Sequence, residues 1–169
     1  AYLQPVHDEW MSEYPPACNR RVEWLSSFSG SAGLVVVTAD KAAIFVDGRY
    51  TLQAKQQVSG DYEVFNSADV TTQSWLAQQL GVGAKIGYDP KLYTKTMLEK
   101  FKQLSIIPTA NLIDELWKNR PSAPATKIFA HDIKYSGESA QSKRKRVAEA
   151  VKKAGADGAF LSAPESVNW

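Results

Sequence analysis

The chain has few of the residues that most catalytic and metal sites require. Its 169 residues include one cysteine, Cys18, and two histidines, His7 and His131. A single cysteine excludes an internal disulfide, and the sequence contains no Cys pair and no His-Glu-x-x-His motif to bind zinc. The two histidines lie far apart in sequence, so no nucleophile–histidine triad is indicated. We therefore expect no metal site and no catalytic residue in this chain, and we expect His7 to be a surface residue rather than a ligand.

The chain also lacks a strong charge and a long apolar run. The 20 Lys and Arg against 18 Asp and Glu give a net charge of +2, so no global field attracts nucleic acid. No apolar run approaches the roughly 20 residues of a membrane-spanning helix. The basic run Lys143–Arg146 is interpreted as a solvated helix face. We expect neither nucleic acid nor a membrane as a partner.

The hydrophobic pattern predicts alternating strands and helices. Short apolar runs predict strands at residues 34–38, 42–46, 62–65, 84–88 and 106–107. Helical spacing and capping residues predict helices at residues 49–58, 71–80, 93–104 and from 111 onward. The first two strands are separated by a short polar turn, which predicts a hairpin. The alternation indicates an α/β fold, a mixed β-sheet flanked by helices.

A linker at residues 121–126 divides the chain. Residues 121–126 are rich in Pro, Ala and Ser, which is typical of a linker. Beyond it the pattern predicts a strand at 127–131, a helix at 139–154 that ends at Gly155, and a strand at 157–162.

A weak internal repeat is found in the sequence, with one copy on each side of the linker. The apolar segment Ala1–Leu3, followed later by Val22–Trp24, resembles Ala159–Leu161, followed by Val167–Trp169. We therefore predict a first domain at residues 1–127 and the truncated start of a second, similar domain at 128–169. A helix precedes the second copy, so we expect the leading helix of the first domain, and any targeting signal, to lie before Ala1.

The loop Gly30–Gly33 is the first segment whose composition allows a functional role. It lacks the Lys and Ser/Thr of a P-loop and precedes a strand rather than a helix. It also fails the nucleophile-elbow pattern, because Ser29 occupies the first glycine position. Two glycines let the backbone turn sharply or approach another segment closely. We therefore interpret the loop as structural and do not expect Ser31 to be a nucleophile.

Arg49 is the candidate binding residue. It follows the strand predicted at 42–46, and ligands often bind where strands of α/β sheets end. Asp47 is expected to cap the next helix, so Arg49 would lie in its first turn, where the helix dipole disfavours a cation. Its planar fork suits a carboxylate or a peptide carbonyl. The alternative is an exposed ion pair with Asp47, which contributes little. The residues alone leave both roles open.

Several segments together resemble a known family. Two are long: Arg20–Gly33 (Arg-Arg-Val-Glu-Trp-Leu-Ser-Ser-Phe-Ser-Gly-Ser-Ala-Gly) and Val46–Ala54 (Val-Asp-Gly-Arg-Tyr-Thr-Leu-Gln-Ala). The short ones are Ser12-Glu13-Tyr14, Gly87-Tyr88-Asp89-Pro90 and Asn111-Leu112-Ile113-Asp114. They resemble the first creatinase-like N-terminal domain of Xaa-Pro aminopeptidases (aminopeptidase P), and Pro164–Trp169 is similar to the start of the second such domain. Trp10 departs from the pattern, since many relatives have a histidine there.

The resemblance implies a metal-dependent Xaa-Pro aminopeptidase, a hydrolase. In that family two creatinase-like domains precede a pita-bread catalytic domain, which holds two divalent metal ions, typically manganese, and removes an N-terminal residue preceding proline. This chain would be the non-catalytic part, inactive alone, that helps to shape the substrate cleft. By motif, Arg49 would be the substrate-binding residue. The expected partners are short peptides with proline in the second position, and the full-length protein is expected to be a cytoplasmic homodimer.

Two other functions share this scaffold. Creatinase-like N-terminal domains also occur in proteins that have lost catalysis, so the alternative is a non-catalytic peptide- or protein-binding module. Creatinase or prolidase is a third possibility, which fits these motifs less well. Intact metal ligands in the downstream sequence would indicate an enzyme, and their loss would indicate a binding module.

Overall fold

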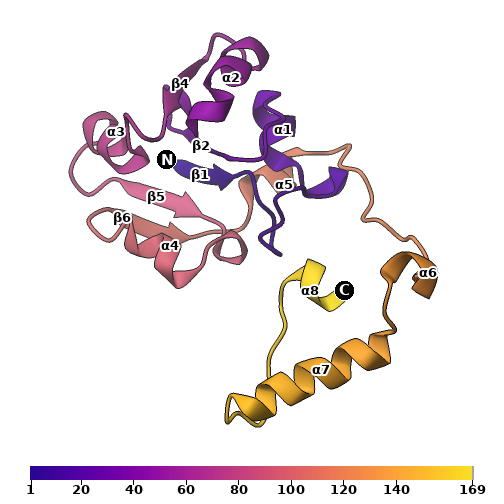
Figure 1. The fold of residues 1–169 in the computed structure, drawn as a ribbon. Coiled ribbons are helices and arrows are strands. Elements are labelled where there is room, and N and C mark those ends of the chain that lie inside the picture. The colour runs from indigo at the N-terminus through magenta and orange to yellow at the C-terminus, as the bar shows by residue number, and fades with distance from the viewer. Residues whose placement is uncertain (169) are drawn as a thin grey trace. The chain divides into compact units, whose positions relative to one another are not determined.

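The structure is a computed structural model that describes residues 1–168. The chain divides into two compact units, Ala1–Pro124 and a second unit that begins at Ala125 (Figure 1). Trp169, the last residue of the internal repeat, lies outside the described residues. The assignment of residues 128–169 to a second domain stays a prediction.

A six-stranded sheet forms the centre of the first unit (Figure 1). Its order is β4-β3-β2-β1-β5-β6. The strands are β1 Tyr2–Pro5, β2 Gly33–Val37, β3 Ala42–Val46, β4 Tyr62–Asn66, β5 Lys85–Tyr88 and β6 Ser105–Pro108. Strand β2 is antiparallel to both of its neighbours, and the other adjacent pairs are parallel. The five remaining strands therefore all end at one edge of the sheet.

The predicted hairpin is confirmed as β2 and β3, and its register explains the apolar sequence. Leu34 pairs with Phe45, and Val35 pairs with Ile44. Because side chains alternate across a strand, Phe45 joins one hydrophobic cluster while Val35 and Ile44 join the cluster on the opposite face. Both faces of this hairpin are buried, which is why its sequence reads as an unbroken apolar run.

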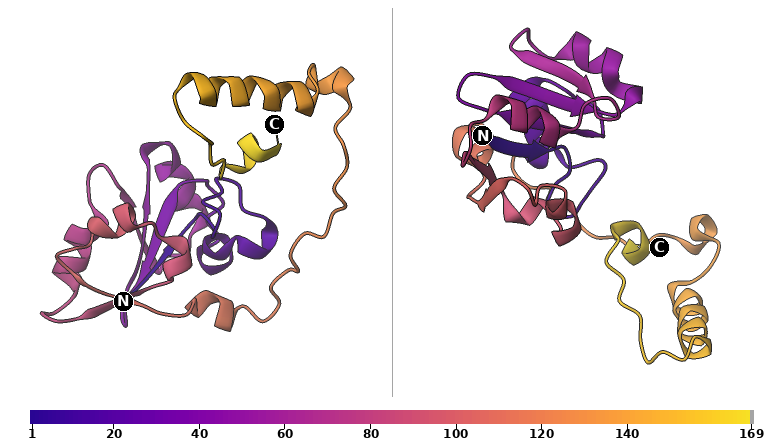
Figure 2. Two further views of the ribbon diagram at one scale, coloured as in Figure 1. Left: turned by 90° about the horizontal axis from the view of Figure 1, so that it is seen from below. Right: turned by 90° about the vertical axis from the view of Figure 1, so that its left-hand side faces the viewer.

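Helices cover both faces of the sheet (Figure 2). Trp75 and Leu76 of α3 (Thr72–Gln79), with Leu98 of α4 (Lys95–Glu99), pack into the first cluster. Val22 of α1 (Arg21–Ser26) and Ala54 of α2 (Thr51–Gln57) pack into the second. The remaining helix of this unit, α5 (Leu112–Leu116), packs on α1. The predicted α/β class, a mixed sheet flanked by helices, is confirmed.

Capping side chains fix where several helices begin. The Thr71 hydroxyl accepts a hydrogen bond from Ser74 N at the start of α3, as predicted. The Asn111 side chain accepts from Ile113 N and Asp114 N and so caps α5, also as predicted. Each of these side chains satisfies backbone donors that the first helical turn leaves without a partner.

The helix predicted at residues 93–104 is mostly wrong, because α4 covers only Lys95–Glu99. Tyr93 is extended and buried, and Thr94 caps the helix after it. Beyond Glu99 the chain continues in turns, where Phe101 N bonds to Leu98 O. Phe101 is therefore still buried without a helix, so the apolar spacing predicted the buried residues but not the conformation.

The second unit contains helices α6 (Ile133–Ser136), α7 (Ala140–Lys153) and α8 (Pro164–Asn168). The helix predicted at 139–154 is confirmed, with Ser139 as its N-cap and Gly155 at a positive φ of 72° after it. The strands predicted at 127–131 and 157–162 are wrong: the described residues beyond Pro108 form no strand. A strand needs a neighbour to satisfy its backbone groups, and this unit offers none. No helix in residues 1–168 has both the length and the hydropathy to cross a membrane.

A buried arginine connects α1, α5 and the loop after β1. The Arg21 side chain is 1% exposed, yet it pairs with two carboxylates. Its Nε lies 2.6 Å from Asp114 Oδ1, and its Nη2 lies 2.7 Å from Glu9 Oε1. Arg120 Nη1 adds a third pair, 2.8 Å from Asp114 Oδ2. Burial opposes ionisation of these carboxyls, but hydrogen bonds from Arg21 hold the pKa of Glu9 and of Asp114 below their usual values.

Candidate functional site

The predicted binding residue lies at the edge of the sheet where five strands end. Arg49 belongs to the 3-10 turn Gly48–Tyr50, directly after β3. The Asp47 side chain accepts a hydrogen bond of 2.9 Å from Arg49 N and so caps this turn, which leads into α2. The predicted cap is confirmed, although the first turn is a 3-10 turn rather than α-helix.

The Arg49 guanidinium is held by Asp47 and remains exposed. Its Nη2 lies 2.6 Å from Asp47 Oδ2, and its Nε lies 3.1 Å from Asp47 Oδ1. The hydrogen bonds from Arg49 lower the pKa of the Asp47 carboxyl, and the same bonds raise the pKa of Arg49. The ion pair considered as the alternative role is thus present. The Arg49 side chain is nevertheless 70% exposed, and its Nη1 bonds to no residue within 1–168.

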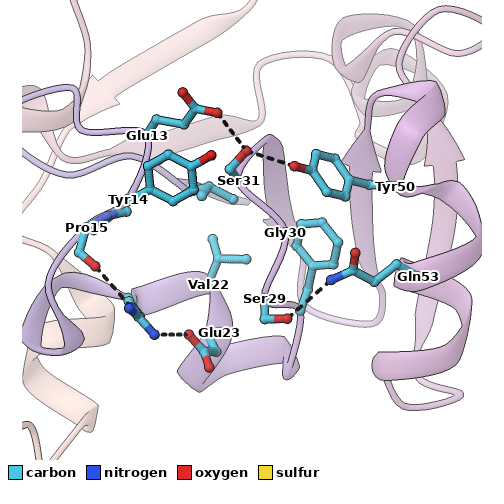
Figure 3. A pocket seen from close by; sticks show the side chains of 13 residues that line it. Glu13, Tyr14, Pro15, Val22, Glu23, Ser29, Gly30, Ser31, Tyr50 and Gln53 are labelled. Atoms are coloured by element: carbon cyan, nitrogen blue, oxygen red, sulfur yellow. Dashed lines mark hydrogen bonds and ion pairs between the residues drawn. The ribbon is translucent and has the colours of Figure 1, made fainter.

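A cavity of about 230 Å3 is lined by Tyr50, the residue that follows Arg49 in sequence (Figure 3). Its walls come from the loop before α1, from α1 itself, from the glycine loop before β2, and from the 3-10 turn that leads into α2 together with the start of α2. The polar and aromatic side chains that line it are Glu13, Tyr14, Arg20, Glu23, Ser29, Ser31, Tyr50 and Gln53. Val6, Val22 and Phe28 supply its apolar lining. It combines an apolar base with convergent polar groups, as small binding sites do.

Ser31 lies in this cavity as a hydrogen-bonding residue (Figure 3). Its hydroxyl donates to Glu13 Oε1 at 3.2 Å, and the Tyr50 hydroxyl lies 2.9 Å from Ser31 Oγ. Neither histidine lines the cavity, so no imidazole base stands beside the hydroxyl. A Cβ on Gly30 would lie 2.3 Å from Phe28 Cζ, so this glycine permits the close approach that its sequence predicted. The geometry agrees with a structural loop.

The other residues weighed in the sequence have structural surroundings. His7 is half-buried rather than on the surface, and its Nε2 donates to the Leu92 carbonyl oxygen at 2.7 Å. Within residues 1–168, no three His, Cys, Asp or Glu residues lie where they could hold a metal ion. In the basic run, Lys143 is buried while Arg144 and Lys145 are exposed, so only part of that run is a solvated face.

Sequence reasoning missed the partners of these residues. It did not predict that Ser31 joins Glu13 to Tyr50, nor that Arg21 joins Glu9 to Asp114. Glu13 and Ser31 are 18 positions apart, and Arg21 and Asp114 are 93 apart. Contacts at such separations leave no periodic or local pattern in one sequence. The only available signal was that these residues, apart from Glu9, belong to the family-like segments.

The chain matches two family models. One, described as the creatinase/prolidase N-terminal domain, matches residues 17–116. A second model with the same description matches residues 119–169. Together they cover all of the chain except residues 1–16 and 117–118.

Curated relatives match along the full chain. Aminopeptidase P2 of Arabidopsis thaliana is 34% identical over 100% of this chain and 26% of its own length. A probable Xaa-Pro aminopeptidase P of Pyricularia oryzae is 36% identical over 99% of this chain and 29% of its own length. The chain thus spans between a quarter and a third of the length of these relatives.

A solved structure has the same fold. It is an X-prolyl aminopeptidase from Caenorhabditis elegans, described as a cytosolic enzyme with a di-nuclear active site. It is 32% identical, with a TM-score of 0.83 over 99% of this chain and 29% of that one. The resemblance read from the sequence is confirmed.

Proposed function

Because the chain belongs to the creatinase/prolidase N-terminal domain family, we propose that it helps to shape the substrate cleft of an Xaa-Pro aminopeptidase. It is the N-terminal domain of an aminopeptidase P family protein. The reaction proposed for the whole protein is hydrolysis of the bond before proline, in short peptides with proline in the second position. The same proposal makes the full-length protein a cytoplasmic homodimer. The proposal for the whole protein is supported by the match, along almost all of this chain, to relatives named as aminopeptidases P.

The observation that carries the proposed role of this chain is the state of Arg49. The Asp47 carboxylate engages its Nε and Nη2, which leaves the N–H groups of Nη1 available for an acceptor outside residues 1–168. A peptide carbonyl or carboxylate is such an acceptor, and a guanidinium fork binds it with defined geometry. We therefore propose Arg49 as the substrate-binding residue of this domain.

The proposed chemistry lies outside this chain. The side chains of residues 1–168 do not form a site for two divalent metal ions, so we place those ions, typically manganese, in a catalytic domain beyond it. In such a domain the metal supplies an activated water for attack on the peptide carbonyl. The contribution of this chain is then to bind and orient the peptide.

The purified chain is expected not to hydrolyse Xaa-Pro peptides, because residues 1–168 contain no metal ligand set. The measurement is release of the N-terminal residue from an Xaa-Pro-Pro peptide, with and without added manganese. The full-length protein serves as the positive control. Turnover that rises in proportion to the concentration of the purified chain, and that a chelator abolishes, would show that this chain has a catalytic site of its own.

In the full-length protein, Arg49→Ala is expected to lower kcat/KM by roughly 10- to 100-fold, since it removes a charge-assisted hydrogen bond to the peptide. The melting temperature should change little, because the Asp47 pair is exposed. Arg146→Ala is a matched control: this arginine is also exposed and paired, with Glu138 at 2.6 Å in the second unit. Kinetics unchanged in Arg49→Ala would reduce Arg49 to a surface ion-pair partner.

The alternative remains a non-catalytic peptide- or protein-binding module on the same scaffold. The two functions differ in the catalytic domain and not in this chain. Sequencing the gene beyond Trp169 distinguishes them: an intact set of Asp, His and Glu metal ligands supports the enzyme, and their loss supports the module.

A further inference from the structure

The Arg49 guanidinium contacts two groups, the Asp47 carboxylate and the ring of Tyr50. Asp47 binds Nε and Nη2 in the plane of the guanidinium. The Tyr50 ring lies under it, with Arg49 Cζ 5.2 Å from the ring centroid. This is the geometry of a cation–π contact, in which the negative face of the ring attracts the cation. The ring therefore limits movements of the guanidinium that the Asp47 carboxylate alone does not limit.

The Tyr50 ring is itself fixed at both ends. Its edge-on contact with Phe28 has ring centroids 5.8 Å apart at 85°. Its hydroxyl lies 2.9 Å from Ser31 Oγ, and Ser31 donates to Glu13. A serine hydroxyl has one proton and a carboxylate only accepts, so the Tyr50 hydroxyl must be the donor to Ser31. The chain of hydrogen bonds thus runs in one direction, from Tyr50 through Ser31 to Glu13 (Figure 3).

The glycine loop leaves room for this arrangement. A Cβ at position 30 would lie 2.8 Å from Tyr50 Cδ1, closer than real side chains come. The ring therefore lies against bare backbone on that side. The Ser31 hydrogen bond fixes the hydroxyl end of the ring, and the contacts with Phe28 and Gly30 limit its rotation about its long axis.

We propose that Tyr50 is a positioning residue for Arg49, held in place by Ser31 and Glu13. The inference rests on the proposed binding role of Arg49. A free arginine side chain loses much rotamer freedom when it binds a ligand, and holding it beforehand reduces that loss. The contribution is present before the reaction and throughout it, so it belongs to KM rather than to kcat. Ser31, which the sequence did not support as a nucleophile, then has a defined task.

The test is a double-mutant cycle in the full-length protein with an Xaa-Pro-Pro peptide as substrate. Tyr50→Leu is expected to raise KM roughly two- to five-fold, the size of an exposed cation–π contact, with kcat nearly unchanged. Tyr50→Phe keeps the ring, so its KM should stay close to the wild-type value. In an Arg49→Ala background, Tyr50→Leu should raise KM no further, because nothing remains to be positioned.

A second variant covers the case in which Tyr50→Leu folds poorly. Ser31→Ala leaves the ring and removes only its hydrogen-bonding partner, so KM should rise less than in Tyr50→Leu. In the Arg49→Ala background, Ser31→Ala should not raise KM. If a substitution of Tyr50 or Ser31 raised KM by the same factor with and without Arg49, the positioning role would be overturned and the proposed function would remain intact. A wild-type KM and kcat in Arg49→Ala would overturn both.

Discussion

Replacing Arg21 with alanine is expected to lower the free energy of unfolding of this chain by about 3 kcal/mol. The Arg21 side chain is 1% exposed and pairs with Glu9 and Asp114, whose side chains are 27% and 31% exposed. Removing the arginine leaves two partly buried carboxylates close together, so the variant loses the pairs and gains a repulsion. Urea unfolding at neutral pH measures the change. Arg49→Ala removes an exposed pair and is the control, and an equal loss in the two variants would contradict the buried role.

The same variant has a predicted pH signature. Glu9 and Asp114 have pKa values held below the ordinary 4.5 and 3.8 by Arg21, although burial opposes this. The unfolded chain therefore binds more protons in acid, so their contribution is full above about pH 4.5 and is lost as pH falls through the folded-state values. Arg21→Ala lacks this contribution. The stability difference between wild type and variant should therefore be largest near neutral pH and narrow in acid, and a pH-independent difference would contradict the ionic origin.

Replacing Phe28 with alanine is expected to cost about 3–5 kcal/mol of stability, the usual range for a large aromatic removed from a core. Phe28 is 1% exposed and belongs to the cluster between the sheet, α1 and α2. It also contacts Tyr50 edge-on and lies against Gly30, where no side chain can move in to fill the space. The loss should thus include a cavity that the loop cannot close.

Urea unfolding measures the loss of stability in Phe28→Ala, and the control is a substitution to alanine at the surface. Leu52 is 68% exposed on α2, so Leu52→Ala should change stability by less than about 0.5 kcal/mol. A Phe28→Ala loss as small as this control would mean that the loop collapses onto the empty space. Because Phe28 supports Tyr50, the variant is also expected to disturb the cavity that Tyr50 lines.

The sequence predicted those parts of the fold whose cause is local. The run at residues 34–38 was predicted as a strand, and β2 forms there, because β-branched residues without polar alternation suit a strand that is buried on both faces. The caps Thr71 and Asn111 were predicted because one side chain and the next turn suffice to form each of them. Such features depend on neighbours within four positions.

Features with distant causes were missed or wrong. The strands predicted around Phe129 and Phe160 had the right composition, but a strand forms only where another strand pairs with it. At the candidate site, Arg49 and its partner Asp47 were foreseen because they are two positions apart. The role of Tyr50 depends on Ser31 and Glu13, which no local pattern connects to it.

The ionic cluster around Arg21 links the end of the first unit to its beginning. Arg120 donates to the Cys18 carbonyl at 2.5 Å and to Asn19 at 3.0 Å, so the end of the first unit is fastened to its beginning. A piece that stopped before Asp114 would keep every strand of the sheet and still leave the buried Arg21 charge with one partner fewer. A piece that keeps both carboxylate partners of Arg21, and the Arg120 pair with Asp114, must therefore extend past the last strand to Arg120.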